Sequence, residues 1–592
     1  MGIQVSKVLI KNYKSISSLL VLLNDKNVFF GKNNTGKSNI LKAISLGFSY
    51  ESIDAEDVFN SKLYPFSYDK KVTVDIYIKP TANGKLTSSF DDDWILVMGE
   101  GKGIDDNSDS FFAFRTELSF DEKRSVYINT KKQIKRWSDD GNHSLAAKFN
   151  SRVLDYIYCE YVDAHRDISE DLRNRKSIWA RLISKIKIEQ AKKDEIQIKL
   201  QEINYSIKEE SKLIQEIEKE MKKTVSEEKY EVNIAPVTKD LETLYKGIDI
   251  YYQSEHFNPI PASNLGSGVR SWAVFSTIKS QINLFASEIT PFHSLLLVEE
   301  PEAHVHPQQQ MQLVKILNET NSQKVIATHS PYVINQLELE TLVRIDKDSS
   351  GTHFYPLSNT FSDVDISAIK HFCMSNKADL VFSRLVVMVE GLTELIAMPI
   401  FFQFYFGISP FDAGVTFVSS DGGLRYKPFL QLLHAYKLNW LLFSDGEAGV
   451  IKSISSALRK ITNNPSFDLA TESRVIKIPA GLNYESYLYG TSFASQIHQV
   501  IDSYEGIQDY INSTYMNSQA WIAFKSKNPI PVFANRNDEC DKCTVFYLKK
   551  NKITLAEFIA EKIVSSCGNK SELPQLIIDL FEKIKTEVNL DE

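Results

Sequence analysis

The sequence predicts an α/β protein in which two α/β blocks follow one another and a long helical segment interrupts the first. Three observations support this fold class. A complete phosphate-loop motif at residues 31–38 stands between an apolar strand and a helix pattern. A second apolar run, at residues 385–389, ends in an acid and a glycine. Between the two, residues 171–230 contain no glycine and no proline, as a long helical segment requires.

Composition and charge limit the possible function classes. The chain has 592 residues, which allow about three or four domains, and 43% hydrophobic with 24% charged residues is typical of an ordinary globular protein. Lys and Arg number 68 against 76 Asp and Glu, a net charge of −8. This balance excludes a protein that holds nucleic acid through bulk positive charge, so any nucleic-acid contact is expected to be local.

Cysteine usage and hydropathy predict where the protein works. Five cysteines are too few and too scattered for a disulfide framework, so a reducing compartment, the cytoplasm, is expected. The most apolar stretch, residues 395–411, is interrupted by Pro399, Gln403 and Gly407 and falls short of a membrane span. We therefore expect no membrane partner.

The first block begins with strand and turn patterns. Residues 5–10 alternate between apolar and polar, and residues 27–30 form an apolar strand that runs into a glycine. A helix pattern follows over residues 38–48. Residues 71–130 predict strands and hairpins, with one apolar run at 94–98, and indicate the antiparallel part of a mixed sheet.

A complete phosphate-binding motif follows the strand at residues 27–30. The pattern G-x-x-x-x-G-K-[ST] is matched in full, directly after a strand and at the start of a helix. Its glycines let backbone N–H groups curl around phosphate oxygens, Lys37 would reach the β- and γ-phosphates of ATP, and the Ser38 hydroxyl would bind Mg²⁺. The predicted nucleotide-binding residues of this loop are Gly31, Asn33, Asn34, Thr35, Gly36, Lys37 and Ser38.

Three later segments agree with an ATP site. Residues 295–298 form an apolar strand followed by Glu299 and Glu300, which has the form of a Walker B strand. The first carboxylate would act on the water bound to magnesium, and the second would orient the attacking water. Residues 265–268, L-G-S-G, resemble the signature loop of ABC-type ATPases, and His329 after a strand resembles their switch histidine. Each segment alone is common, but in this chain order they are specific.

The resemblance to ABC-type ATPases implies an assembly. In that class the signature loop, here with Ser267 and Gly268, contacts the γ-phosphate of ATP held by a second subunit. Closing the sites therefore needs a dimer. We expect a homodimer or higher homo-oligomer through the ATPase domain, with two ATP molecules at a two-fold interface.

A heptad pattern marks the charged segment that interrupts this domain. Apolar residues recur alternately four and three positions apart, with one member missing where Glu210 falls. Two interpretations stand equally: an amphipathic helical hairpin packed on its own domain, or an arm that meets a partner chain. The apolar positions are Ile196, Leu200, Ile203, Ile207, Ile214, Ile217 and Met221.

The second block carries acids at the ends of two apolar strands. Residues 385–389 lead into E-G-x-T-E, and residues 439–443 lead into D-G-E. In a doubly wound sheet the carboxyl ends of the strands meet at one edge, where ligands gather. Carboxylate oxygens there suit Mg²⁺ or Mn²⁺. The candidate metal ligands are Glu390, Glu394, Asp445 and Glu447.

These two acidic sequences resemble a Toprim domain, the metal-dependent phosphotransfer fold of topoisomerases, primases and certain nucleases. The usual second motif is D-x-D, and Glu447 stands in place of its second acid. An ABC-type ATPase joined to a Toprim domain resembles the OLD (overcoming lysogenization defect) endonuclease family over nearly the whole chain. Residues 299–307 look like that family's Walker B segment, and residues 161–167 with Leu172 and Arg173 are similar to a family segment of less certain role.

The resemblance implies further site residues. Residues 422–423 are similar to the family's glycine turn between the acidic motifs. Residues 483–488 resemble its D-L-E-x-x-L sequence, in which Glu485 is the candidate metal-binding carboxylate because asparagine replaces the first acid. The segment with Lys550 and Lys552 resembles the family's basic motif that assists catalysis, although the glycine that usually follows this motif is missing. We favour Lys552.

The family resemblance predicts an ATP-regulated DNA endonuclease in bacterial defence against phage. Five carboxylates would hold two divalent ions, and Lys552 would stabilise charge on the scissile phosphate. The implied cofactors are ATP and Mg²⁺ or Mn²⁺, and the substrate is DNA. The predicted catalytic residues are Glu300, Glu390, Glu394, Asp445, Glu447, Glu485 and Lys552, and the predicted metal ligands are those acids of the Toprim domain together with Ser38 and Glu299.

Partners and rival functions stay open at this point. Gabija-type members of the family imply a helicase-like partner, whereas some relatives act beside a retron reverse transcriptase and its RNA–DNA product. A second function class is an SMC-like ATPase scaffold or DNA-repair clamp, with the helical segment as its arm and an inactive Toprim domain. Primase or topoisomerase chemistry is disfavoured because no tyrosine motif or zinc-binding module accompanies the acids.

The motifs predict four segments along the chain. The helical insertion separates the P-loop from the signature, Walker B and switch histidine, so the ATPase domain has two parts. The segments are residues 1–170, the first part of the ATPase domain; 171–232, the helical insertion and possible dimerisation arm; 233–378, the second part of the ATPase domain; and 379–592, the Toprim nuclease domain with C-terminal elements.

Overall fold

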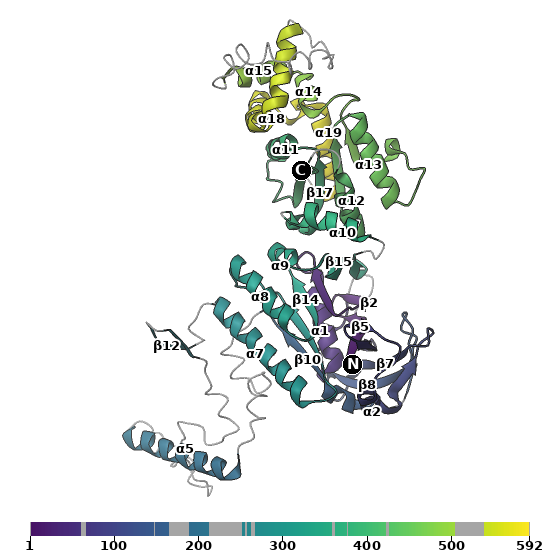
Figure 1. Ribbon diagram of the computed structural model, residues 1–592, viewed down its shortest axis with the longest axis vertical. Helices are drawn as coiled ribbons and strands as arrows, with labels where there is room; N and C mark the ends of the chain where they lie inside the picture. The colour runs from purple at the N-terminus through teal and green to yellow at the C-terminus, as the bar shows by residue number, and fades with distance from the viewer. Residues whose placement is uncertain are drawn as a thin grey trace. The chain divides into compact units, whose positions relative to one another are not determined.

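The chain divides into two compact units in the computed structural model (Figure 1). The first contains Met1–Asn27 and Ser38–Val333, and the second contains Val28–Lys37 and Ile334–Glu592. The predicted four-segment division stays a prediction, because most of the helical insertion lies outside the described residues. The structure describes residues 2–60, 67–146, 148–164, 189–211, 251–254, 257–261, 267–357, 361–375, 377–421, 425–503 and 538–590.

An antiparallel sheet opens the first unit; its antiparallel strands were predicted, but it is a sheet of its own and not part of a mixed sheet. Its strand order is β2-β1-β4-β7-β8-β9, with β5 beside β4 and β6 beside β7. The second strand, β2, was not predicted. The strand bounds are β1 (Gly2–Tyr13), β2 (Ile16–Leu22), β4 (Val72–Ala82), β5 (Lys85–Leu86), β6 (Lys102–Ile104), β7 (Ser110–Asp121), β8 (Val126–Arg136) and β9 (Ser144–Leu145).

The apolar run at residues 94–98 is not a strand, which corrects the prediction. It lies in helix α2 (Asp92–Met98). Asp91 caps this helix, because its side chain accepts a hydrogen bond from the Trp94 backbone N–H at 3.0 Å. A capping aspartate and two acids in the first turn favour a helix start, and they outweigh the β-propensity of the run.

Helix α1 (Lys37–Phe48) begins in the P-loop, as predicted, and lies against this sheet. Gly47 permits the close approach, since a Cβ atom there would lie 3.0 Å from Ile76 Cδ1. Thr116 Oγ1 and Lys131 Nζ donate hydrogen bonds to the Gly47 carbonyl at 2.9 and 2.6 Å. The sheet thus satisfies a carbonyl that the helix end leaves without an intrahelical partner.

The predicted Walker B strand is the middle one of three parallel strands, and the predicted switch histidine follows one of its neighbours. Strand β13 (His293–Glu299) lies between β10 (Ile157–Val162) and β14 (Gln323–Thr328), and both ladders are parallel. Nearly every position of β13 and β14 is buried, as expected for a parallel sheet covered on both faces. Helices α7 (Ser267–Glu288) and α8 (Pro307–Glu319) pack on each other beside these strands (Figure 1). Both predicted strands are confirmed.

The charged segment is described only in helix α5 (Gln190–Glu210). Leu200 is buried, whereas Ile203 and Ile207 of the same predicted heptad seam are exposed. The later heptad positions, from Ile214 onward, lie outside the described residues, so the choice between hairpin and arm stays open. A separate two-stranded hairpin follows, formed by β11 (Tyr251–Ser254) and β12 (Phe257–Pro261).

The second unit begins with the strand that precedes the P-loop. Strand β3 (Lys26–Phe30) pairs in parallel with β15 (Leu342–Asp348), which forms an antiparallel hairpin with β16 (Gly351–Pro356). Phe30, the last residue before the P-loop, packs edge to face on Tyr436 with ring centroids 5.0 Å apart. The start of the P-loop is therefore anchored in an aromatic contact.

A four-stranded parallel sheet forms the rest of the second unit. Its order is β18-β17-β19-β20, and every pair is parallel. Parallel strands joined by helices form a doubly wound α/β arrangement, so the predicted fold class is confirmed. The bounds are β17 (Leu385–Val389), β18 (Val415–Ser419), β19 (Trp440–Ser444), β20 (Val475–Lys477), α9 (Pro331–Asn335), α10 (Asp363–Ile369), α11 (Leu392–Phe406), α12 (Tyr426–Ala435), α13 (Ala448–Ile461), α14 (Tyr484–Tyr489), α15 (Ala494–Ser503), α18 (Asp538–Ser566) and α19 (Gln575–Val588).

The C-terminal helices complete the core of this sheet. Helix α18 packs along α11, and α14 and α15 also contact α18 (Figure 1). One cluster of buried side chains joins β17 to α11, α18 and α19. Its members include Leu385, Val387, Val389, Phe401, Phe402, Ile559, Ile563, Leu580 and Phe581. The C-terminal helices thus pack in the same hydrophobic core as the strands that precede the two acidic motifs.

The most apolar stretch of the sequence is accounted for by this core. Much of residues 395–411 lies in α11, a helix of 15 residues with Pro399 inside it. A membrane span needs about 20 apolar residues, so α11 is too short. In the part of the chain that the structure describes, no helix has both the length and the hydropathy to cross a membrane.

Candidate functional site

Two glutamates stand at the carboxyl end of β17. Glu390 follows the strand, and its Oε2 accepts a hydrogen bond from the Asp445 backbone N–H at 3.3 Å. Glu394 lies in the first turn of α11 and is 4% exposed. Its Oε2 accepts a hydrogen bond from the Gly391 N–H at 3.1 Å, which satisfies a donor at the helix start. The E-G-x-T-E turn therefore places both predicted acids at the sheet edge.

Asp445 and Glu447 follow β19 but differ in environment. Asp445 is 8% exposed, and its Oδ1 accepts a hydrogen bond from the Tyr484 backbone N–H at 2.9 Å. Glu447 is exposed and precedes helix α13 without a side-chain capping bond. At Gly446, between them, a Cβ atom would lie 2.1 Å from the Pro479 carbonyl oxygen, so only glycine fits. The D-G-E sequence thus places one acid inside the cluster and one at its rim.

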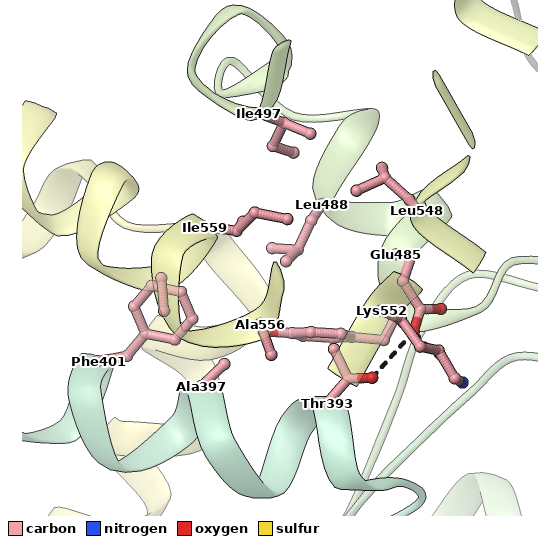
Figure 2. A pocket seen from close by; sticks show the side chains of 12 residues that line it. Thr393, Ala397, Phe401, Glu485, Leu488, Ile497, Leu548, Lys552, Ala556 and Ile559 are labelled. Atoms are coloured by element: carbon pink, nitrogen blue, oxygen red, sulfur yellow. Dashed lines mark hydrogen bonds and ion pairs between the residues drawn. The ribbon is translucent and has the colours of Figure 1, made fainter. Parts of the chain in front are cut away.

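Glu485 joins the cluster from helix α14. It is 6% exposed, and its Oε1 accepts a hydrogen bond from Thr393 Oγ1 at 3.2 Å and lies 3.4 Å from Lys552 Nζ (Figure 2). Asn483, which replaces the first acid of the family sequence, caps α14: its Oδ1 accepts a hydrogen bond from the Ser486 N–H at 3.1 Å. The departure from the family pattern therefore keeps a structural role.

The lysine that meets this cluster is Lys552. It lies on α18 directly after Asn551, whose φ of −116° and ψ of 18° break the helix. Burial lowers the pKa of Lys552, but the nearby carboxylates of Glu485 and Glu394 outweigh it, so the pKa is raised overall. The ammonium therefore stays charged beside the acids. The side chain of Lys550, the other candidate, lies outside the described part of the chain.

The carboxylates raise one another's proton affinity. Burial and then the charges of Glu390, Glu394 and Glu485 raise the pKa of Asp445 to about 8. Burial, followed by the charge of Glu485, raises the pKa of Glu394 to about 7. The pKa of Glu390 is raised as well, again chiefly by burial. Four acids from three segments of the chain therefore interact electrostatically at one place.

This donor set fits a divalent cation. Mg²⁺ and Mn²⁺ prefer carboxylate oxygens, and a bound cation relieves the repulsion that raises these pKa values. Among the residues that the structure describes, no three His, Cys, Asp or Glu side chains already converge at the distances of a metal site. Cation binding therefore requires at least some of these acids to move from the positions described here.

Two buried hydroxyls beside the cluster lack a hydrogen-bond partner within the described ranges. They are Ser444 Oγ and Tyr484 Oη, on the residues just before Asp445 and Glu485. Buried hydroxyls are normally paired with protein or with ordered water. Tyr484 interacts electrostatically with Glu394 and Glu485, so its hydroxyl keeps bonding capacity near the acids.

The P-loop is curled on itself. The Lys37 side chain is 4% exposed, and its ammonium donates hydrogen bonds to the carbonyls of Gly31 at 3.0 Å and Lys32 at 2.8 Å. Thr35 is also buried, whereas Asn33 is exposed. The loop needs left-handed backbone at three positions, Gly31 with a φ of 149°, Asn34 with a φ of 63° and Gly36 with a φ of 103°. This is the geometry that turns backbone N–H groups toward an anion.

Ser38 and Tyr161 hold Glu299, the last residue of β13, from both sides. Ser38 Oγ donates a hydrogen bond to Glu299 Oε1, and the Tyr161 hydroxyl donates one to Glu299 Oε2. Tyr161 stands opposite Leu297 in the ladder of β10 and β13, which brings its ring to the end of the strand. The sequence placed Tyr161 in a family segment but assigned it no role.

The next acid meets the predicted switch histidine. Glu300 adopts a φ of 41°, and its Oε1 lies 3.7 Å from His329 Nε2. Glu302 was not singled out from the sequence, but its Oε1 accepts hydrogen bonds from Thr328 Oγ1 at 2.8 Å and from the His329 N–H at 2.7 Å. Burial raises the pKa of Glu302. The sequence could have indicated this contact, because a third acid, Glu302, follows Glu299 and Glu300 in the same loop.

The predicted signature loop and glycine turn are described only in part. Gly268 lies in the first turn of α7, where a Cβ atom would lie 2.7 Å from Gln309 Oε1. A side chain at this position would displace the end of the Gln309 side chain on α8. Outside the described residues lie the side chain of Ser267 and residues 165–173, 265–266 and 422–423.

Two protein families match the two parts of the chain. The family described as "AAA domain, putative AbiEii toxin, Type IV TA system" matches residues 26–335, which include the P-loop, the acids after β13 and the histidine after β14. The family described as "Overcoming lysogenization defect protein-like, TOPRIM domain" matches residues 381–446, which include both acidic sequences up to Gly446.

Individual relatives match across both parts. The Old nuclease of Escherichia phage P2 is 23% identical, over 75% of this chain and 77% of its own length. Endonuclease GajA of Bacillus cereus strain VD045 is 22% identical, over 75% of each chain. The solved C-terminal region of the Xanthomonas campestris pv. campestris OLD protein covers 36% of this chain and 98% of that chain, with 18% identity and a TM-score of 0.27.

Proposed function

Because the chain belongs to the OLD family, with an AAA-type ATPase domain followed by an OLD-like Toprim domain, we propose that it is an ATP-regulated, divalent-metal-dependent DNA endonuclease. The observation that carries the proposal is the cluster of buried carboxylates with one lysine at the carboxyl edge of the parallel sheet. Acids in this position are expensive to bury without a cation. Relatives that match both parts of the chain are nucleases.

The residues of the cluster have separate roles in this proposal. Glu390, Glu394, Asp445 and Glu485 would hold the cations, and the exposed Glu447 would complete the set from the rim. Divalent ions, when bound, would activate water and neutralise charge on the phosphate. The Lys552 side chain is 42% exposed and reaches Glu485, so its ammonium is positioned to donate a hydrogen bond to a phosphate oxygen at the same edge.

The ATPase residues would regulate cutting. The P-loop N–H groups and Lys37 would hold the phosphates, and Ser38 with Glu299 would face the magnesium ion. Glu300 would orient the attacking water, with His329 3.7 Å from its carboxylate. The signature residues Ser267 and Gly268 would serve ATP in a second copy, so the regulated form is a homodimer or higher homo-oligomer.

The proposed biological setting is bacterial defence against phage, with the protein in the cytoplasm. A relative named Endonuclease GajA supports a Gabija-type system, in which a helicase-like protein is the partner. A retron reverse transcriptase with its RNA–DNA product is the other candidate partner. Genes adjacent to this one would distinguish the two.

Incubation of supercoiled plasmid with the full-length protein tests the proposal. Nicked or linear plasmid is expected with Mg²⁺ or Mn²⁺ and none with chelator, and adding ATP or a non-hydrolysable analogue is expected to change the rate. Lys37→Ala should remove the effect of ATP while keeping metal-dependent cutting. An intact plasmid under every nucleotide and metal condition would overturn the proposal.

One observation supports the second candidate function, an ATPase scaffold with an inactive Toprim domain. Ile203 and Ile207 on α5 are exposed along the predicted heptad seam, as an arm that meets another chain requires. In a scaffold, replacing the isoleucines would impair function while replacing the acids would not. The plasmid assay with acid variants separates the two functions.

A further inference from the structure

A single hydroxyl connects the first turn of α11 to the carboxylate that arrives from α14. We propose that Thr393 is a positioning residue that orients Glu485 for cation binding. The inference deepens the proposed function, since it names how one ligand of the same site is held. Thr393 is distinct from the predicted ligands, because its hydroxyl acts through Glu485.

Thr393 is fixed where its hydroxyl reaches the acid. The residue is 4% exposed and lies in the helical turn that also carries Glu394. Its Oγ1 donates a hydrogen bond to Glu485 Oε1 at 3.2 Å, the dashed contact in Figure 2. One turn of α11 therefore places one predicted ligand directly and holds a second through a hydrogen bond.

On the side away from the other carboxylates, Glu485 borders a mostly apolar pocket. Ala397, Phe401, Leu488 and Ile559 line the adjoining pocket from α11, α14 and α18 (Figure 2). The cavity has a volume of about 20 Å³, which is room for about one water molecule. In such a setting a buried carboxylate depends strongly on the few polar groups that reach it.

Within the described residues, the hydrogen bond and the ion pair of the Glu485 side chain use the same oxygen. Thr393 Oγ1 lies 3.2 Å from Oε1, and Lys552 Nζ lies 3.4 Å from the same atom. Neither contact uses Oε2, so neither of them blocks the approach of a cation to that oxygen. The threonine thus fixes the orientation of the carboxylate without occupying its second oxygen.

Threonine and lysine differ in how firmly they hold the acid. Lys552 has a long side chain that is 42% exposed, and it is the group proposed to reach the phosphate. Thr393 has a short, β-branched side chain, which loses less rotamer freedom when it forms a bond. When Lys552 turns toward DNA, Thr393 remains to hold Glu485 in place.

Binding of Mn²⁺ to the metal-free, full-length protein, followed by electron paramagnetic resonance, tests the inference. Thr393→Val keeps the shape and removes the hydroxyl, whereas Thr393→Ser keeps the hydroxyl. Loss of a group that orients a metal ligand typically weakens metal affinity about 10- to 100-fold. We expect a weakening of that size in Thr393→Val and near wild-type affinity in Thr393→Ser.

Two controls keep the test decisive. Thr462→Val removes a hydroxyl that bonds to Leu458 on α13 at 2.8 Å, outside the cluster, and should leave Mn²⁺ affinity unchanged. If Thr393→Val does not fold, Thr393→Ala against Thr393→Ser gives the same comparison without the methyl group. The thermal unfolding midpoint of each metal-free variant reports folding separately from metal binding.

Each outcome has a distinct meaning. Equal Mn²⁺ affinity in wild type, Thr393→Val and Thr393→Ser would overturn the positioning role even if the protein cuts DNA. Weaker binding in Thr393→Val alone, in a protein that leaves plasmid intact, would support the positioning role and refute the nuclease function. If the wild type shows no Mn²⁺ binding that depends on Glu485, both fail.

Discussion

The P-loop and the carboxylate cluster reach their geometry in opposite ways. The P-loop is one continuous segment, and its lysine is held by carbonyls of its own loop at 2.8 and 3.0 Å. The cluster is assembled from β17, α11, β19, α14 and α18, and its acids repel one another. The difference teaches that a contiguous motif is stable by local backbone geometry, whereas a dispersed acid site is held by burial and tertiary bonds against its own charge.

The largest expected effect is loss of cutting when charge is removed from the cluster. Asp445→Asn and Glu390→Gln keep the shape of each side chain, so the fall in plasmid nicking should exceed about 100-fold, more than loss of a group that only orients a ligand. The unfolding midpoint of the metal-free variants should not fall, because the charge they remove is one that burial and repulsion disfavour.

Glu557→Gln is the matched control for these substitutions, since Glu557 is an exposed acid of α18. Its nicking rate should equal that of the wild type. Full nicking activity in Asp445→Asn and Glu390→Gln would show that the cluster does not carry the reaction.

The next effect separates the two regions. Lys37→Ala removes the ammonium that would hold the phosphates, so ATP turnover should fall about 100-fold or more. Mn²⁺ binding to the cluster should be unchanged, because its acids lie on other elements of the chain. Phosphate release and Mn²⁺ titration of the same preparation check both statements, with the exposed Lys85→Ala as control. Unimpaired turnover in Lys37→Ala would remove the P-loop assignment.

A smaller effect concerns the backbone that carries the D-G-E sequence. In Gly446→Ala the new Cβ would lie 2.1 Å from the Pro479 carbonyl oxygen, a collision with backbone that cannot rotate away. We expect a loss of about 1–3 kcal/mol in the free energy of unfolding, the range for overpacking, and weaker Mn²⁺ binding.

Gly449→Ala provides the comparison three residues along the chain. A Cβ atom at Gly449 meets nothing within 4 Å, and the residue lies in α13. This substitution should stabilise the protein by up to about 1 kcal/mol. Denaturant unfolding of both variants checks the contrast, and equal stabilities would refute the close approach at Gly446.

A further effect is a pH dependence in the sheet that supports the P-loop helix. Burial lowers the pKa of Lys131 from 10.5 to about 7. Folding therefore favours the neutral amine, so this contribution to stability is complete above about pH 10.5 and is lost as the pH falls to about 7. The slope is at most about 1.4 kcal/mol per pH unit.

Lys131→Met should remove this dependence. Between pH 7 and pH 10, the unfolding midpoint of the wild type is expected to rise relative to that of Lys131→Met. The difference in unfolding midpoint between the wild type and Lys132→Met should not change over this range. Lys132 is a suitable control because its side chain is 38% exposed and paired with Glu117. A flat difference for Lys131→Met would mean that the amine is charged in the folded protein.

Much of the fold was predictable because its strands are short apolar runs next to turn residues. Strand β17 has the predicted bounds, and α1 begins at the predicted P-loop. The prediction of a strand at residues 94–98 was wrong because Asp91, three residues before Trp94, caps a helix. Local capping chemistry outweighed the β-propensity of the run, and the apolar pattern alone does not record it.

The residues of the site were predictable where they belong to one contiguous sequence motif. The acids of E-G-x-T-E and D-G-E follow their strands as expected. Which groups hold Glu485 was not predictable, because Thr393 and Lys552 reach it from distant segments. The hydroxyl of Tyr161 on Glu299 was missed for the same reason, since it depends on the register of two neighbouring strands.

The most direct test of the central claim is a crystal structure of the full-length protein grown with Mn²⁺, examined for anomalous scattering. Manganese is expected among Glu390, Glu394, Asp445 and Glu485, with carboxylate oxygens turned toward it. Manganese bound elsewhere, with these four carboxylates left as they are, would contradict the account.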